Sequence, residues 1–262
     1  MGQESLRQDG WEGAPPAPEG PSTLECERSW IYLTLMCVGG YFGAFTYVLR
    51  GGVFCNAQTG NILLFGMALG EGAWSRAAYY LIPMSAYFLG AVVSEALPGP
   101  IRRRGLIRWD TLLVLVEMVV VALLGLLPES APYQISQVAV NFICSMQYNT
   151  FRQAGNIPMA TTFCTNHVRQ AGVAAVKAAR DGDGAQVRRM LAHFSMLAAF
   201  VVGAAVSTVL CGPLQGRTIW VALIPLAVVF VRLLRADLTK ERGTFDQVGG
   251  QAVLGRQSPR AT

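Results

Sequence analysis

The chain has 262 residues, of which 52% are hydrophobic and only 14% are charged, and its mean hydropathy is +0.38. Because a soluble domain carries about 25% charged residues, the chain lacks the polar surface that a soluble fold requires. The net charge of +5 would suit nucleic acid, but the basic residues gather in short loops between apolar runs, as in cytoplasmic loops of membrane proteins. We therefore predict a multi-pass protein of the cytoplasmic membrane, in contact with the lipid bilayer and with no nucleic-acid partner.

Six apolar stretches are long enough to cross a bilayer core about 30 Å thick. They cover approximately residues 30–49, 77–97, 110–127, 133–151, 190–211 and 218–235. Two shorter apolar stretches, 57–70 and 158–175, begin with polar residues. The composition of the two ends predicts a disordered N-terminal tail over residues 1–27 and a flexible C-terminal tail over residues 239–262.

Loop charges indicate how the two short stretches lie. Arg and Lys are frequent in the loops 98–109 and 169–189 and after the last apolar stretch. If both short stretches crossed the bilayer fully, some of these basic segments would lie outside. If both enter and leave on one side, all three basic segments and both termini face the cytoplasm, as the excess of positive charge inside requires. Six spans with two re-entrant segments is the prediction, and a seven-span version is the alternative.

The second half of the sequence repeats features of the first. The segment GAVVS (Gly90–Ser94) recurs as GAAVS (Gly203–Ser207), and each half has the order span, short polar-started segment, span, span. Three crossings per half place the halves in opposite orientations, as in many secondary transporters. We predict an all-α membrane protein of six transmembrane helices, built as two inverted three-helix repeats (residues 28–128 and 129–238), each with a broken, re-entrant short helix. Chance similarity among apolar residues is the alternative.

A polar run, VFCNAQTGNILLFG, follows the first span. Gly51 and Gly52 allow the chain to break there. Asn56, Gln58 and Thr59 are predicted to cap a new helix that starts near Thr59. Such a broken backbone survives in hydrocarbon only where protein buries it or a wet cavity adjoins it.

The second half contains a similar interruption. Gly155 and Pro158 are predicted to make the break, with Pro158 in the first helical turn. The capping chemistry recurs in Thr161, Thr162, Thr165 and Asn166.

Two half-helices would thus direct their N-termini, each with a partial positive charge, towards the middle of the molecule. Arg50 and Arg152 stand just before the two breaks, and the arrangement favours a small polar or anionic solute. The alternative is that the polar residues cap turns at the membrane surface and the arginines reach the headgroups. The predicted substrate-binding residues are Arg50, Asn56, Gln58, Thr59, Gly60, Asn61, Asn149, Arg152, Thr162, Thr165, Asn166 and His167.

The segments GGYFGAFTYVLRGGVFCNAQTGNILLFGMAL and MQYNTFRQAGNIPMATTFCTNHV make the sequence similar to the YoaK-like family of bacterial integral membrane proteins. The resemblance extends from about Trp30 to Arg235, and the TGN motif of the family is present as Thr59, Gly60 and Asn61. The second motif departs from the family pattern, because Asn166 stands where glycine is expected. The family has no established activity, so the resemblance implies a membrane location and leaves the function open.

Glu117 lies in the middle of the third apolar stretch. Ionisable residues inside a membrane are functional candidates by default, so Glu117 is predicted to be a proton-coupling site; the alternative is a buried glutamate bonded to a neighbouring helix. A charge on His167 would oppose the helix dipole, so we expect this residue to be neutral if it is buried. Gly39 and Gly43 permit close helix contact, either within the fold, which we favour, or in a homodimer.

These features indicate a class of function. We predict a transporter or channel for a small polar or anionic solute, bound between the two half-helix N-termini. A non-transporting membrane scaffold or sensor is the alternative, and an intramembrane enzyme acting on lipid is the least favoured class. No enzyme motif, cofactor motif or metal-ligand spacing is present, and the six cysteines show no CxxC pair. No cofactor, metal or catalytic residue is therefore predicted.

Overall fold

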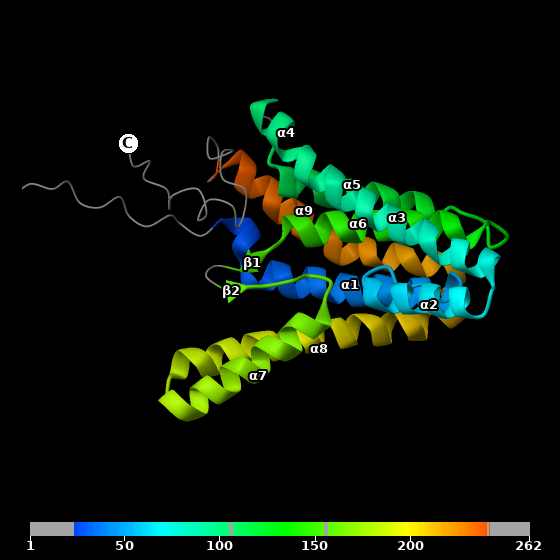
Figure 1. Ribbon diagram of the computed structural model, residues 1–262. Helices are drawn as coiled ribbons and strands as arrows, with labels where there is room; N and C mark the ends of the chain where they lie inside the picture. Colours follow the sequence, from blue (N-terminus) through cyan, green and yellow to red (C-terminus); the bar gives the residue numbers. More distant parts are fainter. Residues whose placement is uncertain (1–23, 105–106, 155–156, 240, 242–262) are drawn as a thin grey trace, which may run out of the picture.

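The computed structural model describes residues 24–104, 107–154, 157–239 and 241, and these residues are almost entirely helical (Figure 1). Most of the two predicted tails lies outside the described residues. The tail boundary at residue 27 is wrong, however, because Glu25–Glu27 form a short 3-10 helix, η1, with Cys26 buried. Burial of apolar side chains on the bundle orders the chain from Leu24 onwards.

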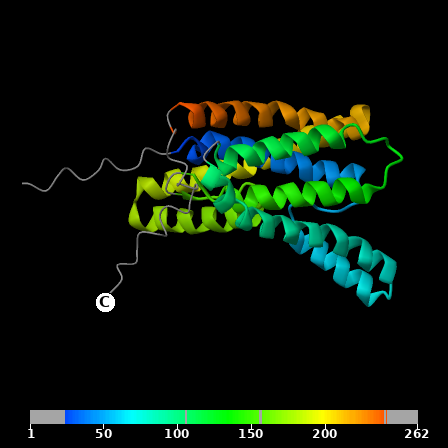
Figure 2. The same ribbon diagram turned by 90° about the horizontal axis from the view of Figure 1, so that it is seen from above.

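The described elements follow the predicted order, but helices occupy much of the two stretches predicted to be basic loops, 98–109 and 169–189, because Arg and Lys are compatible with a helix. They are η1, α1 (Ser29–Leu49), α2 (Gln58–Gly70), α3 (Trp74–Ala96), α4 (Pro98–Arg104), α5 (Trp109–Leu124), α6 (Tyr133–Thr150), β1 (Gln153–Ala154), β2 (Ile157–Pro158), α7 (Cys164–Asp181), α8 (Gly184–Leu214), η2 (Gln215–Ala222) and α9 (Leu223–Leu238). The helices α1, α3, α5, α6, α8 and α9 run along the long axis of the molecule (Figure 1). The hairpin of α2 and α3 angles away from the bundle, as the view from above shows (Figure 2).

Two helix pairs form the most extensive contacts, α1 with α8 and α3 with α6. Glycines allow both pairs to approach closely. A Cβ atom added at Gly203 of α8 would lie 1.9 Å from the carbonyl oxygen of Cys37, and one at Gly90 of α3 would lie 2.4 Å from that of Phe142. The two glycines of the repeated segments therefore serve the same purpose, the contact of a second long helix with the first long helix of the other half.

The outer surface is apolar over much of its area. Large hydrophobic side chains are exposed on several helices, among them Leu63 (64%), Phe88 (71%), Val209 (73%) and Ile224 (67%). A soluble protein rarely exposes contiguous apolar surface on this scale, whereas a bilayer covers it. The apolar helices thus indicate a membrane protein.

Within the described part of the chain, three helical stretches are long and apolar enough to cross a membrane: Ser29–Leu49, Trp74–Ile101 and Gly184–Leu238. The last of them contains α8, η2 and α9. Among the other predicted spans, α5 has 16 residues, and α6 contains several glutamines and asparagines. The count of six spans therefore stays a prediction.

The beginning and the end of the described chain lie together. The Glu25 carboxylate accepts a hydrogen bond from Arg232 of α9 at 3.1 Å, and the Glu25 amide donates to the carboxylate of Glu241 at 2.6 Å. Both ends of the bundle sequence are thus at the same end of the molecule (Figure 1).

A buried ionic cluster joins the start of α5 to the end of α9. Arg108 is 4% exposed, and its guanidinium lies 3.2 Å from the Asp110 carboxylate and 3.3 Å from that of Glu241. The Arg108 amide also donates to the Asp237 carboxylate at 3.1 Å. Desolvation lowers the pKa of Arg108, but Asp110 and the other anionic neighbours outweigh it and hold the pKa above its usual value, so Arg108 stays charged. Burial raises the pKa of the adjacent Cys26 thiol, which is therefore neutral.

Candidate functional site

The first break follows α1 and leads back into the molecule. Gly51 and Gly52 have φ angles of 77° and 71°, which favour glycine, as the sequence predicted. Helix α2 begins at Gln58, one residue from the predicted start at Thr59. The predicted side-chain cap is wrong, because the N-cap residue is Ala57 and no side chain bonds to the free amides there.

The second break differs from its prediction. Pro158 does not start a helix: it lies in β2, which pairs antiparallel with β1. The hairpin continues into a hydrogen bond from the Met159 amide to the Arg152 carbonyl oxygen, at 2.9 Å. This pairing satisfies backbone groups as the chain returns inwards. Helix α7 therefore begins only at Cys164, after Phe163, and again no side chain caps its amides.

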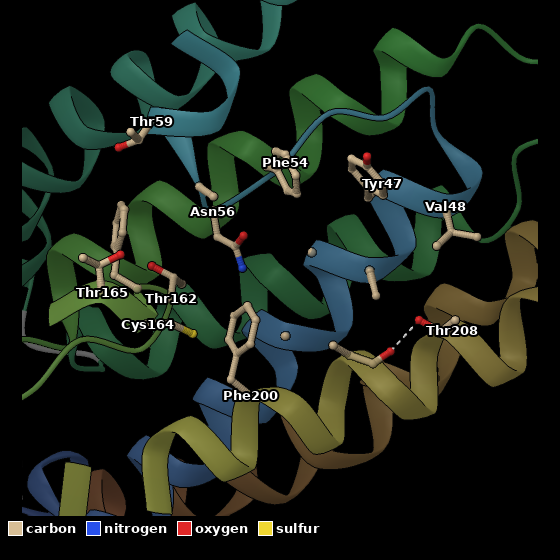
Figure 3. A pocket seen from close by; sticks show the side chains of 16 residues that line it. Tyr47, Val48, Phe54, Asn56, Thr59, Thr162, Cys164, Thr165, Phe200 and Thr208 are labelled. Carbon is tan, nitrogen blue, oxygen red and sulfur yellow. Dashed lines mark hydrogen bonds between the residues drawn. The ribbon is translucent and has the colours of Figure 1, made fainter. Parts of the chain in front are cut away.

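The N-termini of α2 and α7 meet at one cavity of about 420 Å³. From this cavity α2 runs towards one end of the molecule and α7 towards the opposite end (Figure 1). Figure 3 shows Asn56 and Thr59 of the first break and Thr162 and Thr165 of the second break around the same hollow. Helices α1 and α8 supply the remaining wall. The predicted meeting of the two breaks is therefore present.

The cavity offers hydroxyl groups without charged side chains in its lining. Thr59 and Thr165 are exposed within it. Thr162 is buried. Its hydroxyl makes no hydrogen bond of normal geometry with the described residues, but it lies close to the Tyr87 hydroxyl. The Thr208 hydroxyl donates to the Ala204 carbonyl oxygen at 2.8 Å (Figure 3), which leaves it able to accept.

Three other predicted residues of the first break mainly hold the backbone. Asn56 donates to the Gly39 carbonyl oxygen at 2.9 Å. Asn61 is fully buried, accepts from the Phe54 amide at 3.0 Å and donates to the Phe54 carbonyl oxygen at 2.6 Å. Gln58 donates to Asn141 of α6 at 2.8 Å. These contacts fix the break, and only Asn56 among the three also lines the cavity.

The glycines near the first break are enclosed by the fold. Gly60 lies against the Phe54 ring, which would be 2.9 Å from an added Cβ atom. Gly39 lies against the Thr161 backbone and Gly43 against the Asn56 amide. The GxxxG pair is thus used inside the molecule, which is the favoured alternative, while the homodimer stays an untested alternative.

The two predicted arginines do not line the cavity. Arg50 is buried, with its guanidinium 3.4 Å from Glu129 and 5.4 Å from the centre of the Phe45 ring. Arg152 lies 3.0 Å from Glu95 and also contacts Asn149. Both arginines lie just before the breaks, as predicted. Each one lies just after a helix, α1 or α6, and its side chain bonds to an acidic residue outside the cavity.

Asn149 and Asn166 lie outside the cavity as well. Asn149 donates to Ser94 at 2.9 Å, while Asn166 accepts from Arg169 at 3.3 Å. Both line a separate pocket of about 370 Å³ together with Arg152. The sequence placed them correctly near the breaks, but helical rotation turns them to other faces.

His167 lies in the first turn of α7, where it is buried and forms a pair with His193 of α8. Nε2 of His167 lies 2.7 Å from the Ala160 carbonyl oxygen, and the two Nδ1 atoms are 2.9 Å apart. A carbonyl oxygen only accepts, so Nε2 of neutral His167 carries the hydrogen and its Nδ1 accepts. His193 must then donate from Nδ1. The hydrogen-bond pattern therefore assigns both tautomers.

Glu117 is fully buried and faces Gln147 of α6. With the Gln147 amide nitrogen turned towards Glu117, it donates to the two carboxylate oxygens at 3.2 and 3.3 Å, and its oxygen accepts from Thr161 at 3.1 Å. In the opposite orientation the nitrogen donates to the Leu35 carbonyl oxygen at 3.4 Å. The amide oxygen then faces Glu117, which must carry a proton to bond with it. The first orientation thus suits an ionised Glu117 and the second a protonated one.

Replacing Gln147→Leu should destabilise the protein by about 1–3 kcal/mol, because it removes the buried partner of Glu117. The additional change Glu117→Gln should add little to that loss, since the two side chains form one unit. Unfolding of the single and double variants in mixed detergent micelles measures both effects. Fully additive losses would show that the two residues do not interact.

Some of these residues were not predicted from the sequence. Arg108 and Asp110 stand directly beside the start of an apolar run, and this position could have indicated a charged helix end. Asp237, which accepts a hydrogen bond from the Arg108 amide, is distant in sequence and could not be paired with it. Gln147 was recognised only as a polar residue on a span. Among the described residues, no group of three or more metal-ligating side chains lies together.

Residues 31–232 match the family described as "Protein of unknown function (DUF1275)". The chain belongs to this family. The DUF1275 region contains both breaks, the cavity and the helix pairs that enclose it. No curated protein and no solved structure matches the chain. The function has therefore to be inferred from the site itself.

Proposed function

We propose that this DUF1275 protein moves a small polar or anionic solute across the cytoplasmic membrane. The observation that supports it most is the convergence of two half-helix N-termini on one cavity of about 420 Å³. In transporters with broken helices, such N-termini point at electronegative groups of the substrate. The buried Thr162 hydroxyl, close to that of Tyr87, adds a second polar group at this place.

The cavity lining limits the class of solute. It has hydroxyl, thiol and amide groups together with Tyr47, Phe54 and Phe200, and no charged side chain. The partial positive charges of two helix ends then supply the main attraction. A solute with an electronegative group and at most a small net negative charge fits best, since a highly charged anion would have no full countercharge there.

The proposed architecture is two inverted three-helix repeats in a six-span, multi-pass arrangement with cytoplasmic termini. Several contacts support it, because α1 with α8 corresponds to α6 with α3, and α2 with α3 corresponds to α7 with α8. The opposite directions of α2 and α7 agree with inversion (Figure 1). The similarity to the YoaK-like family is consistent with this arrangement and implies no particular activity.

Proton coupling through Glu117 is part of the proposal. Gln147 connects the Glu117 carboxyl group to Thr161, and the next residue, Thr162, lines the cavity. A change in protonation would reorient the Gln147 amide and alter its bond to the second break. In a reconstituted system, Glu117→Gln should abolish the pH dependence of uptake, and unchanged pH dependence would remove Glu117 from the mechanism.

Water access to the cavity tests the proposed site. Cys164 lines it, whereas Cys55 and Cys144 are buried elsewhere. In native membranes, a small charged methanethiosulfonate reagent should modify Cys164 and spare Cys55 and Cys144, as peptide mass spectrometry would show. A hydrated pathway is required for this labelling, so an unmodified Cys164 would contradict a transport role.

A ligand screen identifies the solute class. Small anions and polar metabolites are tested for a thermal shift of the purified protein in detergent. A true ligand should lose its shift in Thr162→Val and Thr59→Val, which remove cavity hydroxyls, and keep it in Thr34→Val. Thr34 is a suitable control because its hydroxyl bonds within α1, to Trp30, and does not line the cavity. Equal shifts in all three variants would place the ligand elsewhere.

A membrane scaffold or sensor is the second candidate. Gln58 and Asn61 favour it, since their side chains hold the first break and do not line the cavity. In that case the breaks would serve packing alone, and the cavity would be filled by lipid chains. This candidate would be favoured if the reagent left Cys164 unmodified and if no ligand gave a thermal shift that Thr162→Val removes.

A further inference from the structure

The α7–α8 hairpin contains a second polar pocket, distinct from the cavity between the half-helices. Its volume is about 100 Å³, and β2 covers one side. A space of this size has room for a few water molecules and so suits a single small oxyanion group. Its polar lining consists of Gln170 and Lys177 of α7 and Gln186, Arg189 and His193 of α8.

The lining is basic and has no acidic member. Lys177 and Arg189 form no ion pair with any described residue, and neither β2 nor the facing sides of α7 and α8 contribute a carboxylate to the pocket. The two glutamines supply further hydrogen-bond donors. Lys177 and Arg189 carry like charges beside the same pocket and repel each other, and an anion between them would offset that repulsion.

His193 adds a buried group directed at the same pocket. It is 3% exposed, and its Nδ1 is committed to His167. Nε2 has no hydrogen-bond partner among the described residues, so it is the nitrogen left for a ligand. Because Nδ1 already carries the hydrogen, any proton that His193 takes up must go to Nε2.

We propose that this pocket binds an oxyanion group of the sulfate or phosphate type, and that His193 takes up a proton at Nε2 on binding. Without an anion, Lys177 and Arg189 oppose a further positive charge. With an anion bound, Nε2–H donates to it, while the Nδ1–H bond to His167 is unchanged. The neutral His167 holds the ring in place through Ala160. Anion affinity therefore rises as pH falls.

Inorganic sulfate is the suitable probe, since it does not titrate between pH 5.5 and 7.5. Calorimetric titration of the full-length protein in an uncharged detergent, at constant ionic strength, should show affinity that increases as pH falls, by up to about tenfold per pH unit for one proton. Arg189→Gln and Lys177→Gln should each weaken binding about tenfold or more. Arg188→Gln makes the same charge change on an exposed neighbour outside the pocket and should leave affinity unchanged.

The variant His193→Gln separates the proton from the anion. Its amide still donates but cannot be protonated, so sulfate should bind more weakly and without pH dependence. An unchanged pH dependence in His193→Gln, sulfate binding indifferent to Arg189 and Lys177, or no binding at pH 5.5 would each overturn the proposal. None of these outcomes bears on the solute cavity, which lies elsewhere on α7 and α8.

The same titration in lipid nanodiscs identifies the source of the oxyanion. Discs of phosphatidylcholine alone are compared with discs that also contain phosphatidylglycerol. If the anionic headgroup occupies the pocket, phosphatidylglycerol should weaken sulfate binding by competition in the unmodified protein and not in Arg189→Gln. Equal sulfate affinity in both discs would identify a free ion as the occupant. Both results support the pocket, and they differ only in what fills it.

Discussion

Replacing Gly203→Ala should destabilise the protein by about 3 kcal/mol or more, at the upper end of the effects of overpacking. The added Cβ atom would lie 1.9 Å from the Cys37 carbonyl oxygen and 3.0 Å from the Tyr41 amide nitrogen. These are backbone atoms, which cannot rotate away as a side chain can. Helices α1 and α8 would have to separate, and with them two walls of the solute cavity. Unfolding in mixed detergent micelles measures the loss.

Gly212 provides the matched control in the same helix. Nothing lies within 4 Å of a Cβ atom added there. Gly212→Ala should therefore be neutral or stabilise the protein by up to about 1 kcal/mol, through its higher helix propensity. If the two variants were equally stable, α1 and α8 would not touch as closely as described.

Arg108→Leu should have an effect of similar size, about 3–5 kcal/mol. The change leaves the Asp110 and Asp237 carboxylates buried without the positive charge that faces them. These residues join α5 to α9, so the substitution should loosen the packing at the end of the molecule where the described chain begins and ends. The free energy of unfolding in mixed micelles checks the magnitude.

An exposed ion pair offers the comparison. Arg76 lies 2.7 Å from Glu71, and about half of each side chain is exposed. Arg76→Leu should change the stability by no more than about 1 kcal/mol, because solvent screens such a pair. A loss for Arg108→Leu as small as that for Arg76→Leu would show that the cluster is solvated.

Local features of the sequence predicted the helical character and the positions of the long helices. Apolar runs placed the long helices to within a few residues, since the requirement to cover about 30 Å of hydrocarbon sets their length. Gly51 and Gly52 located the first break because only glycine adopts their φ angles readily. Glu117 was identified as buried because an ionisable residue in the middle of an apolar run has few other places to lie.

The direction of side chains was harder to predict. Pro158 suits a helix start and also the edge of a short hairpin, and only the pairing with β1 decides between them. Arg50 and Arg152 were placed in the site by proximity in sequence, yet each bonds to an acidic residue distant in sequence: Glu129 in the loop before α6 and Glu95 in α3, respectively. Such partners depend on helix rotation and tertiary packing, which the periodicity of one sequence does not define.

The crossed pairing of α1 with α8 and α3 with α6 has a consequence for biogenesis. The ribosome has to make roughly 130 further residues after α1 before α8 begins, which takes on the order of ten seconds at about 5–20 residues per second. During this interval α1 can persist in the bilayer because its own backbone hydrogen bonds are satisfied, but its glycine-lined face stays in contact with lipid. The most extensive contacts of α1 and α3 are made with α8 and α6, so a chain that stops after α5 would leave α1 and α3 without their main neighbours.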